Sequence, residues 1–141
     1  MEEIVIDSAN AVVGRLASSA AKELLRGKRV HLVNAEQAVI SGRPKFLEEF
    51  FKARLDRGDP YHGPFYPKRP DQMLKRVVRG MVSYKKPKGR EAFKRLRVHI
   101  SIPEELKGKE LAKIKQAENR LECRHTSLGD LAVKLGAKKV W

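Results

Sequence analysis

Cysteine is nearly absent from this 141-residue sequence, which contains only Cys123. A single cysteine cannot form an internal disulfide, and no zinc site can be built from cysteine pairs. The histidines His31, His62, His99 and His125 do not have the spacing of metal ligands either. The sequence therefore excludes a disulfide-stapled domain, predicts no metal site and fits a reducing compartment.

Long apolar runs are also missing. No uncharged stretch approaches the roughly 20 residues that a membrane-spanning helix requires. Glu2 and Glu3 precede the first short apolar run, where a signal peptide would carry basic residues. We therefore expect a cytoplasmic protein with no membrane partner.

Motifs that bind nucleotide cofactors are absent as well. The chain opens with a predicted strand and helix, but Gly14 is the only glycine between them, so the glycine-rich dinucleotide fingerprint does not occur. No Walker motif is present. Cys123 and His125 stand two residues apart, a spacing that would put a thiol and a base on one face of a strand. No third catalytic group accompanies them, so we expect no enzyme, no cofactor and no small-molecule substrate.

Acidic residues are few in comparison with basic ones. The chain has 17 Asp plus Glu against 31 Lys plus Arg, a net charge of +14. Such an excess predicts a polyanionic partner, with nucleic acid as the first candidate and an anionic membrane surface as the second. Residues 71–100 hold ten basic and two acidic residues, which is more than half of the net charge. Because a solvated helix face usually mixes both signs, this segment predicts contact with phosphates rather than solubility alone.

The hydrophobic pattern predicts an α/β domain. Residues 3–7 and 30–34 are short runs typical of strands, and the apolar residues of 13–25 recur at helical spacing. This strand–helix–strand order implies a parallel pair of strands with a right-handed crossover. We expect one core, formed by Val5, Val13, Leu16, Ala20, Leu24, Val33, Val77, Val78 and Ile100.

Shorter patterns predict the remaining elements. Helices are expected from Pro44 onward, over about 71–84, 90–96 and 109–121, and over 128–135, with a strand over about 98–102. Ser127 and Asp130 have the spacing of a capping box at the start of the last helix. Gly136 is a typical stop for that helix.

Basic and apolar side chains separate on the predicted helix 71–84. At about 100° per residue, Lys75, Arg76 and Arg79 fall within roughly 100° of one another, and the apolar residues occupy the other side. The predicted helix 90–96 shows a similar separation, and a basic loop joins the two. We expect one continuous cationic surface that contacts phosphates. Its residues are Lys75, Arg76, Arg79, Lys85, Lys86, Lys88, Arg90, Lys94 and Arg97.

A proline-rich loop before this segment places aromatic residues beside cations. Tyr61, Phe65 and Tyr66 come just before Lys68 and Arg69. Such rings can stack on unpaired bases, or they can anchor the loop over the following helix, and the sequence leaves both interpretations open. The further candidate RNA-binding cations are Arg15, Arg43, Lys45, Lys68 and Arg69.

Several short motifs, taken in their order along the chain, resemble those of a known family. Gly14-Arg15-Leu16-Ala17, Val33-Asn34-Ala35-Glu36 and Ser41-Gly42 are similar to motifs of the L13 family of large-subunit ribosomal proteins. The segments Phe65–Asp71 and Gly89–Phe93 look like the archaeal and eukaryotic cytosolic branch. The resemblance covers nearly the whole chain, and the order and spacing of the motifs carry it.

The resemblance implies a fold and a function. The fold is α/β, with three layers (α/β/α) around a small parallel sheet of about four strands and a C-terminal helical extension. Residues 1–103 would form the core of a single domain, with 104–141 as the extension packed on it. The function is to bind and stabilise large-subunit rRNA, beside neighbouring ribosomal proteins, from an early step of subunit assembly. No homo-oligomer is expected.

The chain departs from the family pattern in two places. Val82-Ser83 stand where most members carry Leu-Pro, which leaves the end of the preceding helix undecided. Residues 104–122 match the family least, and no role is transferred to them. Two other hypotheses are a nucleic-acid-binding regulator outside the ribosome and a small α/β enzyme with a phosphorylated substrate. The missing glycine-rich loop weighs against the enzyme.

Overall fold

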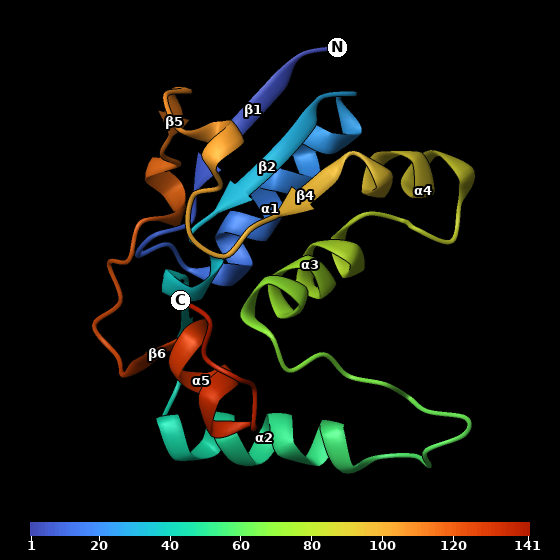
Figure 1. Ribbon diagram of the computed structural model, residues 1–141, viewed down its shortest axis with the longest axis vertical. Coiled ribbons are helices and arrows are strands. Elements are labelled where there is room, and N and C mark those ends of the chain that lie inside the picture. Colours follow the sequence, from blue (N-terminus) through green and yellow to red (C-terminus); the bar gives the residue numbers. More distant parts are fainter.

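Four parallel strands form the central sheet of the structure, a computed structural model that describes residues 1–141. The strands are β1 (Glu3–Asp7), β2 (Arg29–Val33), β4 (Leu96–Val98) and β5 (Leu111–Ala112), in the order β4-β2-β1-β5 (Figure 1). α1 (Val13–Leu25) connects β1 to β2, which pair in parallel along their full length. The predicted strand–helix–strand unit is confirmed.

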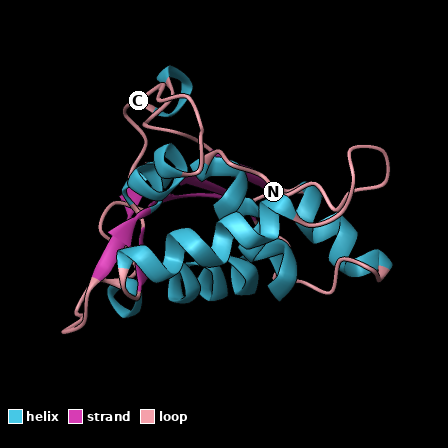
Figure 2. Ribbon diagram, turned by 90° about the horizontal axis from the view of Figure 1, so that it is seen from below, coloured by secondary structure: helices cyan, strands magenta, loops and turns pink.

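Helices α1, α3 (Pro70–Met81) and α4 (Pro87–Lys94) cover one face of this sheet. Figure 2 shows the helices gathered mainly on one side of the strands. Leu16 and Leu24 of α1 and Leu74 and Val78 of α3 are completely buried there. Burying a side chain of this size stabilises a fold by roughly 1.5–3 kcal/mol, so the contact between α1 and α3 is a main source of stability.

The opposite face of the sheet carries a second, small apolar cluster. Val5 and Val33 pack there against Leu106 of the 3-10 turn η2 (Glu104–Leu106). Successive strand residues point to opposite faces of a sheet, so Val5 cannot join its neighbour Ile6 in the main core. The predicted single core is therefore wrong for Val5 and Val33. The three-layer α/β/α arrangement is confirmed, with a thin layer on this side.

Two other predicted core residues are only partly buried. Val77 packs against the main core but keeps part of its side chain exposed. Ile100 lies beyond the end of β4 and belongs to neither apolar cluster. The remaining predicted members, Val13, Leu16, Ala20, Leu24 and Val78, lie in the main core as expected.

A two-stranded sheet ties the C-terminal segment to the core. β3 (Val39–Ser41) pairs antiparallel with β6 (His125–Ser127), which leads directly into α5 (Leu128–Lys134). Ser127 Oγ accepts the backbone N–H of Asp130 at 3.2 Å. This is the N-cap contact that the capping-box pattern predicts.

α2 (Pro44–Asp56) is an outlying helix at the bottom of Figure 1. It packs on α5, and Leu47 is its only fully buried residue. Its outer face leaves Phe46 and Phe50 largely exposed. None of the helices in the structure is both long and apolar enough to span a membrane.

The helix predicted over 109–121 does not form. In its place β5 pairs with β1, and the 3-10 turn η3 (Lys115–Ala117) buries Ala117 in the main core. Helix propensity in such a polar segment is a weak preference. Pairing with the sheet edge and burial of one alanine outweigh it.

The boundaries around the basic segment also differ from the prediction. α3 ends at Met81 because Val82 has an extended backbone (φ −101°, ψ 134°). α4 begins at Pro87, before the expected start at 90, since proline is favoured at the first position of a helix. The following strand, β4, is Leu96–Val98 and not 98–102.

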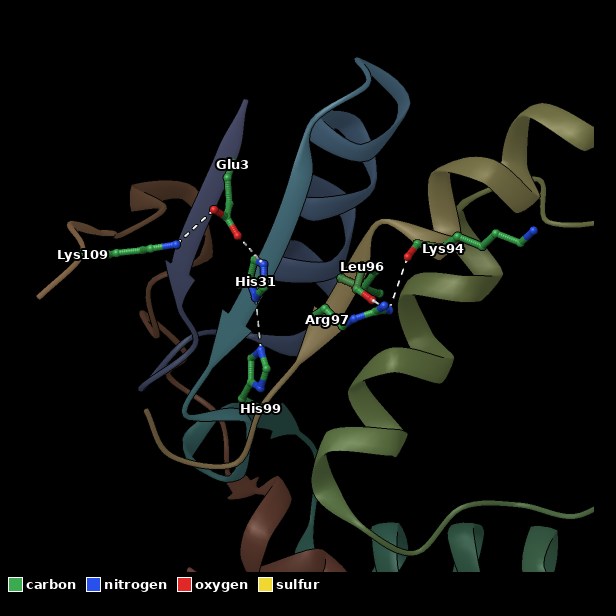
Figure 3. A network of polar contacts seen from close by, with 7 residues as sticks. All are labelled: Glu3, His31, Lys94, Leu96, Arg97, His99 and Lys109. Atoms are coloured by element: carbon green, nitrogen blue, oxygen red, sulfur yellow. Dashed lines mark hydrogen bonds and ion pairs between the residues drawn. The ribbon is translucent and has the colours of Figure 1, made fainter. Parts of the chain in front are cut away.

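Two histidines form a hydrogen-bonded pair on the second face of the sheet (Figure 3). His31 Nδ1 lies 3.1 Å from His99 Nε2. His31 Nε2 lies 2.7 Å from one carboxylate oxygen of Glu3, without the alignment of a hydrogen bond, and Lys109 donates to the other at 3.0 Å. Burial lowers the pKa of His31, although Glu3 opposes this, and burial together with the charge of His31 lowers the pKa of His99.

We predict that acid destabilises the fold through this histidine pair. Because the pKa of each ring is lower in the folded chain, the unfolded chain binds more protons as the pH falls below about 6.5. The Tm should therefore drop between about pH 7 and pH 5, above the range in which ordinary carboxylates titrate. A His31→Gln, His99→Gln variant should show a smaller drop, and His62→Gln, in an exposed loop, should behave like the parent. An equal drop in all three proteins would contradict this account.

Candidate nucleic-acid interface

The cationic face of α3 lies opposite the face that fills the core. Leu74 and Val78 are completely buried, whereas Lys75, Arg76 and Arg79 are half-buried and reach the surface. This separation follows from the sequence, because residues three and four apart share one face of a helix. The same helix therefore contributes to the core and presents three cations outward.

An aromatic ring supports each of these three cations. Arg76 Cζ lies 4.5 Å from the ring centre of Tyr66, Arg79 Cζ lies 4.7 Å from that of Tyr84, and Lys75 Nζ lies 5.4 Å from that of Phe93. The rings come from the loop before α3, the loop after it and α4. Such cation–π contacts hold long side chains in fewer conformations. A partner that binds them then restricts less side-chain motion.

The three cations and Phe93 line a shallow groove, which we call the basic groove. Its volume is about 340 Å³, and its lining is Phe65, Pro67, Gln72, Lys75, Arg76, Arg79 and Phe93. No carboxylate takes part in the lining. The groove thus combines positive charge with exposed ring surface.

Two contacts hold the lysine-rich turn between α3 and α4 in place. Arg90 donates to the backbone carbonyl of Lys85 at 3.0 Å. The backbone of Gly89 lies so close to the Ser83 carbonyl that a Cβ at Gly89 would overlap it. This close contact fixes the start of α4, and Lys85, Lys86 and Lys88 are exposed.

Almost none of the candidate cations has an acidic partner. Arg69 is the exception, with its Nε 3.4 Å from Asp71. Some basic residues of other regions are paired: Lys28 contacts Glu2 and Glu23, and Lys109 contacts Glu3. The surplus charge is greatest on the surface formed by α3, α4 and their connecting turn, which we call the α3–α4 surface, because residues 71–100 hold ten basic and two acidic residues. This charge favours an external anion.

Comparison with known proteins agrees with the motif resemblance. A model of the family described as ribosomal protein L13 matches residues 1–105. The chain belongs to the ribosomal protein L13 family. It is similar to the large ribosomal subunit protein uL13 of Methanosarcina barkeri, with 46% identity over 138 residues, 95% of this chain and 98% of that protein. The corresponding protein of Methanopyrus kandleri is 45% identical over 139 residues, 96% of this chain and 87% of that protein.

A third archaeal relative extends the match to almost the whole chain. The uL13 protein of Haloarcula marismortui is 39% identical over 139 residues, which cover 99% of this chain and 94% of that protein. The segment beyond residue 105, outside the family model, is thus shared with L13 relatives. Membership in this family of structural ribosome components also confirms that the chain is not an enzyme.

Contrary to the sequence prediction, Arg97 of this L13 chain does not share a helix face with Arg90 and Lys94. It belongs to β4, and its guanidinium donates to the carbonyl oxygens of Lys94 and Leu96 at 3.3 Å (Figure 3). Together with Arg29, Lys94 and Lys109 it lines a separate hollow of about 390 Å³ on the second sheet face. Figure 3 also shows the Lys94 side chain extending away from this network.

Of the predicted cations, only Lys75, Arg76 and Arg79 line the basic groove. Arg15 is exposed in the first turn of α1. Arg43 lines a different hollow together with Arg124, and Lys45 is exposed on α2. Lys68 lines a further hollow, of about 470 Å³, which also contains acidic residues.

The three aromatic residues of the loop before α3 differ in their exposure. Tyr61 is 88% exposed and Phe65 is 68% exposed, so both rings are free to stack on a partner. Tyr66 is half-buried and anchors the loop over α3, as the second interpretation holds.

Sequence reasoning missed one cation of this region, Arg54 of α2. Arg54 Nη1 donates to Tyr66 Oη at 3.0 Å, and its guanidinium lies 4.3 Å from the ring centre of Phe50. The signal was present, because Arg54 follows Phe50 and Phe51 at the spacing of one helix face. The contact with Tyr66 could not be predicted, because it depends on the course of the long loop between α2 and α3.

Metal and thiol chemistry find no support in the geometry. No three His, Cys, Asp or Glu side chains lie close enough together to hold a metal ion. His125 Nδ1 lies 3.4 Å from the carbonyl oxygen of Cys123, and its Nε2 lies 3.2 Å from the Asn119 side-chain nitrogen. These contacts do not join the imidazole to the thiol.

The two helical glycines near the basic groove should respond oppositely to alanine. Gly89→Ala places a methyl group against the Ser83 carbonyl and should destabilise the fold by more than about 1 kcal/mol. Gly80→Ala meets no atom within 4 Å and should be neutral or stabilising by up to about 1 kcal/mol, since alanine favours helix. Denaturant unfolding of both variants measures the difference. Equal stabilities would show that α4 does not contact Ser83 this closely.

Proposed function

We propose that this protein is a structural constituent of the large ribosomal subunit that binds and stabilises large-subunit rRNA through the α3–α4 surface. It joins the subunit early in assembly, in the cytoplasm, beside other large-subunit proteins. Membership in the L13 family supports the ribosomal role. The residues that contact RNA are inferred from this chain's own geometry.

The unpaired positive charge of α3, α4 and their connecting turn carries the proposal. Cations that lack carboxylate partners repel one another, and this repulsion weakens the isolated fold. RNA phosphates relieve the repulsion, and the counterions released on binding add to the affinity. Elsewhere, the charges of Arg26 and Arg120 are already offset by Glu23 and Glu118, so a phosphate would relieve less repulsion there.

The shape and aromatic content of the surface favour folded RNA over an anionic membrane. Phe65 and Phe93 line the basic groove between the cations. Unpaired bases stack on such rings, and the backbone that carries them supplies the phosphates. A bilayer surface presents its phosphates without flat aromatic groups to fill the groove.

The charge of this surface predicts the salt dependence of rRNA binding. If six to eight cations meet phosphates, the plot of log affinity against log salt should have a slope of about −4 to −7. Replacing Arg76, Arg79, Lys86 and Arg90 with Gln should flatten that slope by up to about 3–4 and weaken binding. The variant should still fold, because surface changes of this kind alter stability by about 0.5 kcal/mol or less each.

A matched control variant tests whether the loss of binding depends on where the charges lie or only on how many are removed. Replacing Arg26, Lys28, Lys113 and Arg120 with Gln removes the same net charge, but these cations lie beside carboxylates. The control should bind large-subunit rRNA with a slope close to that of the parent. If both variants lose the same affinity, the α3–α4 surface is not the main contact. Sedimentation of the parent away from the large subunit at moderate salt would contradict the ribosomal role itself.

A further inference from the structure

An apolar pocket opens beside the basic groove, between α2, α3 and α5. Its volume is about 200 Å³, and six of its ten lining residues are hydrophobic. Met73 and Leu128 of the main core form part of the wall, with Phe51 and the half-exposed Val77. This cavity explains why Val77 is not fully buried.

Two arginines and a tyrosine give this pocket its polar side. Arg54 and Arg76 both line it, and both guanidinium groups lie beside the Tyr66 ring, at 5.3 Å and 4.5 Å from its centre. No carboxylate lines the pocket. By contrast, the two hollows of about 470 Å³ and 390 Å³ contain Asp or Glu side chains. The charge of the apolar pocket therefore favours an anionic ligand.

The pocket and the basic groove adjoin each other, because both are lined by Pro67 and Arg76. A ligand whose phosphates bind along the groove can therefore place a flat apolar group in the pocket. A nucleotide of single-stranded RNA has this chemistry, since its base has two apolar faces and its phosphate is held by Arg or Lys.

We propose that one unpaired nucleobase of the bound RNA inserts into this pocket, while Arg54 and Arg76 hold its phosphates. This inference rests on the proposed rRNA binding and identifies the residues that would contact an unpaired nucleotide of the RNA. The base fills space that the free protein leaves without van der Waals contacts. An apolar side chain of a neighbouring protein is the competing occupant, and the test distinguishes the two.

Gly80 provides a way to close the pocket without disturbing the fold. It lines the pocket, and a Cβ added there meets no atom within 4 Å. Gly80→Leu should therefore fold and fill part of the space. Gly80→Ala adds only a methyl group and is the matched control, because both changes favour helix.

The experiment compares parent, Gly80→Ala and Gly80→Leu on large-subunit rRNA transcribed in vitro. Affinity is measured by filter binding, base accessibility by dimethyl sulfate and carbodiimide modification, and backbone protection by hydroxyl radicals. In the parent, an unpaired base should be protected. In Gly80→Leu this base should become reactive and affinity should fall at least about 5-fold, the loss of one stacked base, while backbone protection persists. Gly80→Ala should resemble the parent.

Two results would overturn the inference without touching the proposed function. In the first, Gly80→Leu binds as tightly as the parent with the same protected bases, as expected if a protein side chain occupies the pocket. In the second, backbone protection and base protection vanish together although the melting curve is unchanged. Failure of the parent itself to bind the rRNA would instead contradict the proposed function.

Discussion

Burial of one face of α3 is the constraint on which the other features of this surface depend. Leu74 and Val78 set the rotation of the helix against α1 and the sheet. Once that rotation is set, the helical period leaves Lys75, Arg76 and Arg79 only the outer side. Rings from three other segments then lie against the charged ends and orient them. The core and the candidate RNA surface are two sides of one helix, and a change that turns α3 would damage both.

The positive charge of this protein opposes the stability that its core supplies. A net charge of +14 on a chain of this length opposes folding through self-repulsion. Carboxylates offset part of it near the N-terminus, where Glu2, Glu3 and Glu23 contact basic residues. Around α3 and α4 the only acidic residues are Asp71 and Glu91, and neither forms an ion pair with a cation of these two helices, so a partner with negative charge would relieve the repulsion there. If this partner is rRNA, as proposed, folding and RNA binding are coupled through these side chains.

Local periodicity was enough to predict the parts of the fold that bury a whole helix face. The extent of α1, the cationic side of α3 and the Ser127 cap all follow from spacing within a few residues. Elements that depend on a distant neighbour could not be predicted in this way. β5 exists because β1 offers a free edge, and residues 109–121 carry no local sign of it.

The candidate site was predictable to a similar degree. Its cations stand in the sequence as a run of one sign, and Lys75, Arg76 and Arg79 lie together on the groove where the helix face predicted. Arg97 was misplaced because the chain turns into β4 before it. The apolar pocket and the role of Arg54 required the structure, since they depend on how α2 and its following loop return to α3.

The central claim is that unpaired cations of α3, α4 and their turn contact rRNA phosphates. Lysine acetylation of the free and rRNA-bound protein, read by mass spectrometry, tests it residue by residue. The account predicts that Lys75, Lys85, Lys86, Lys88 and Lys94 lose reactivity on binding, whereas Lys28 and Lys113, which lie beside carboxylates, keep theirs. Protection of Lys28 and Lys113 with unchanged reactivity at the α3–α4 lysines would contradict it.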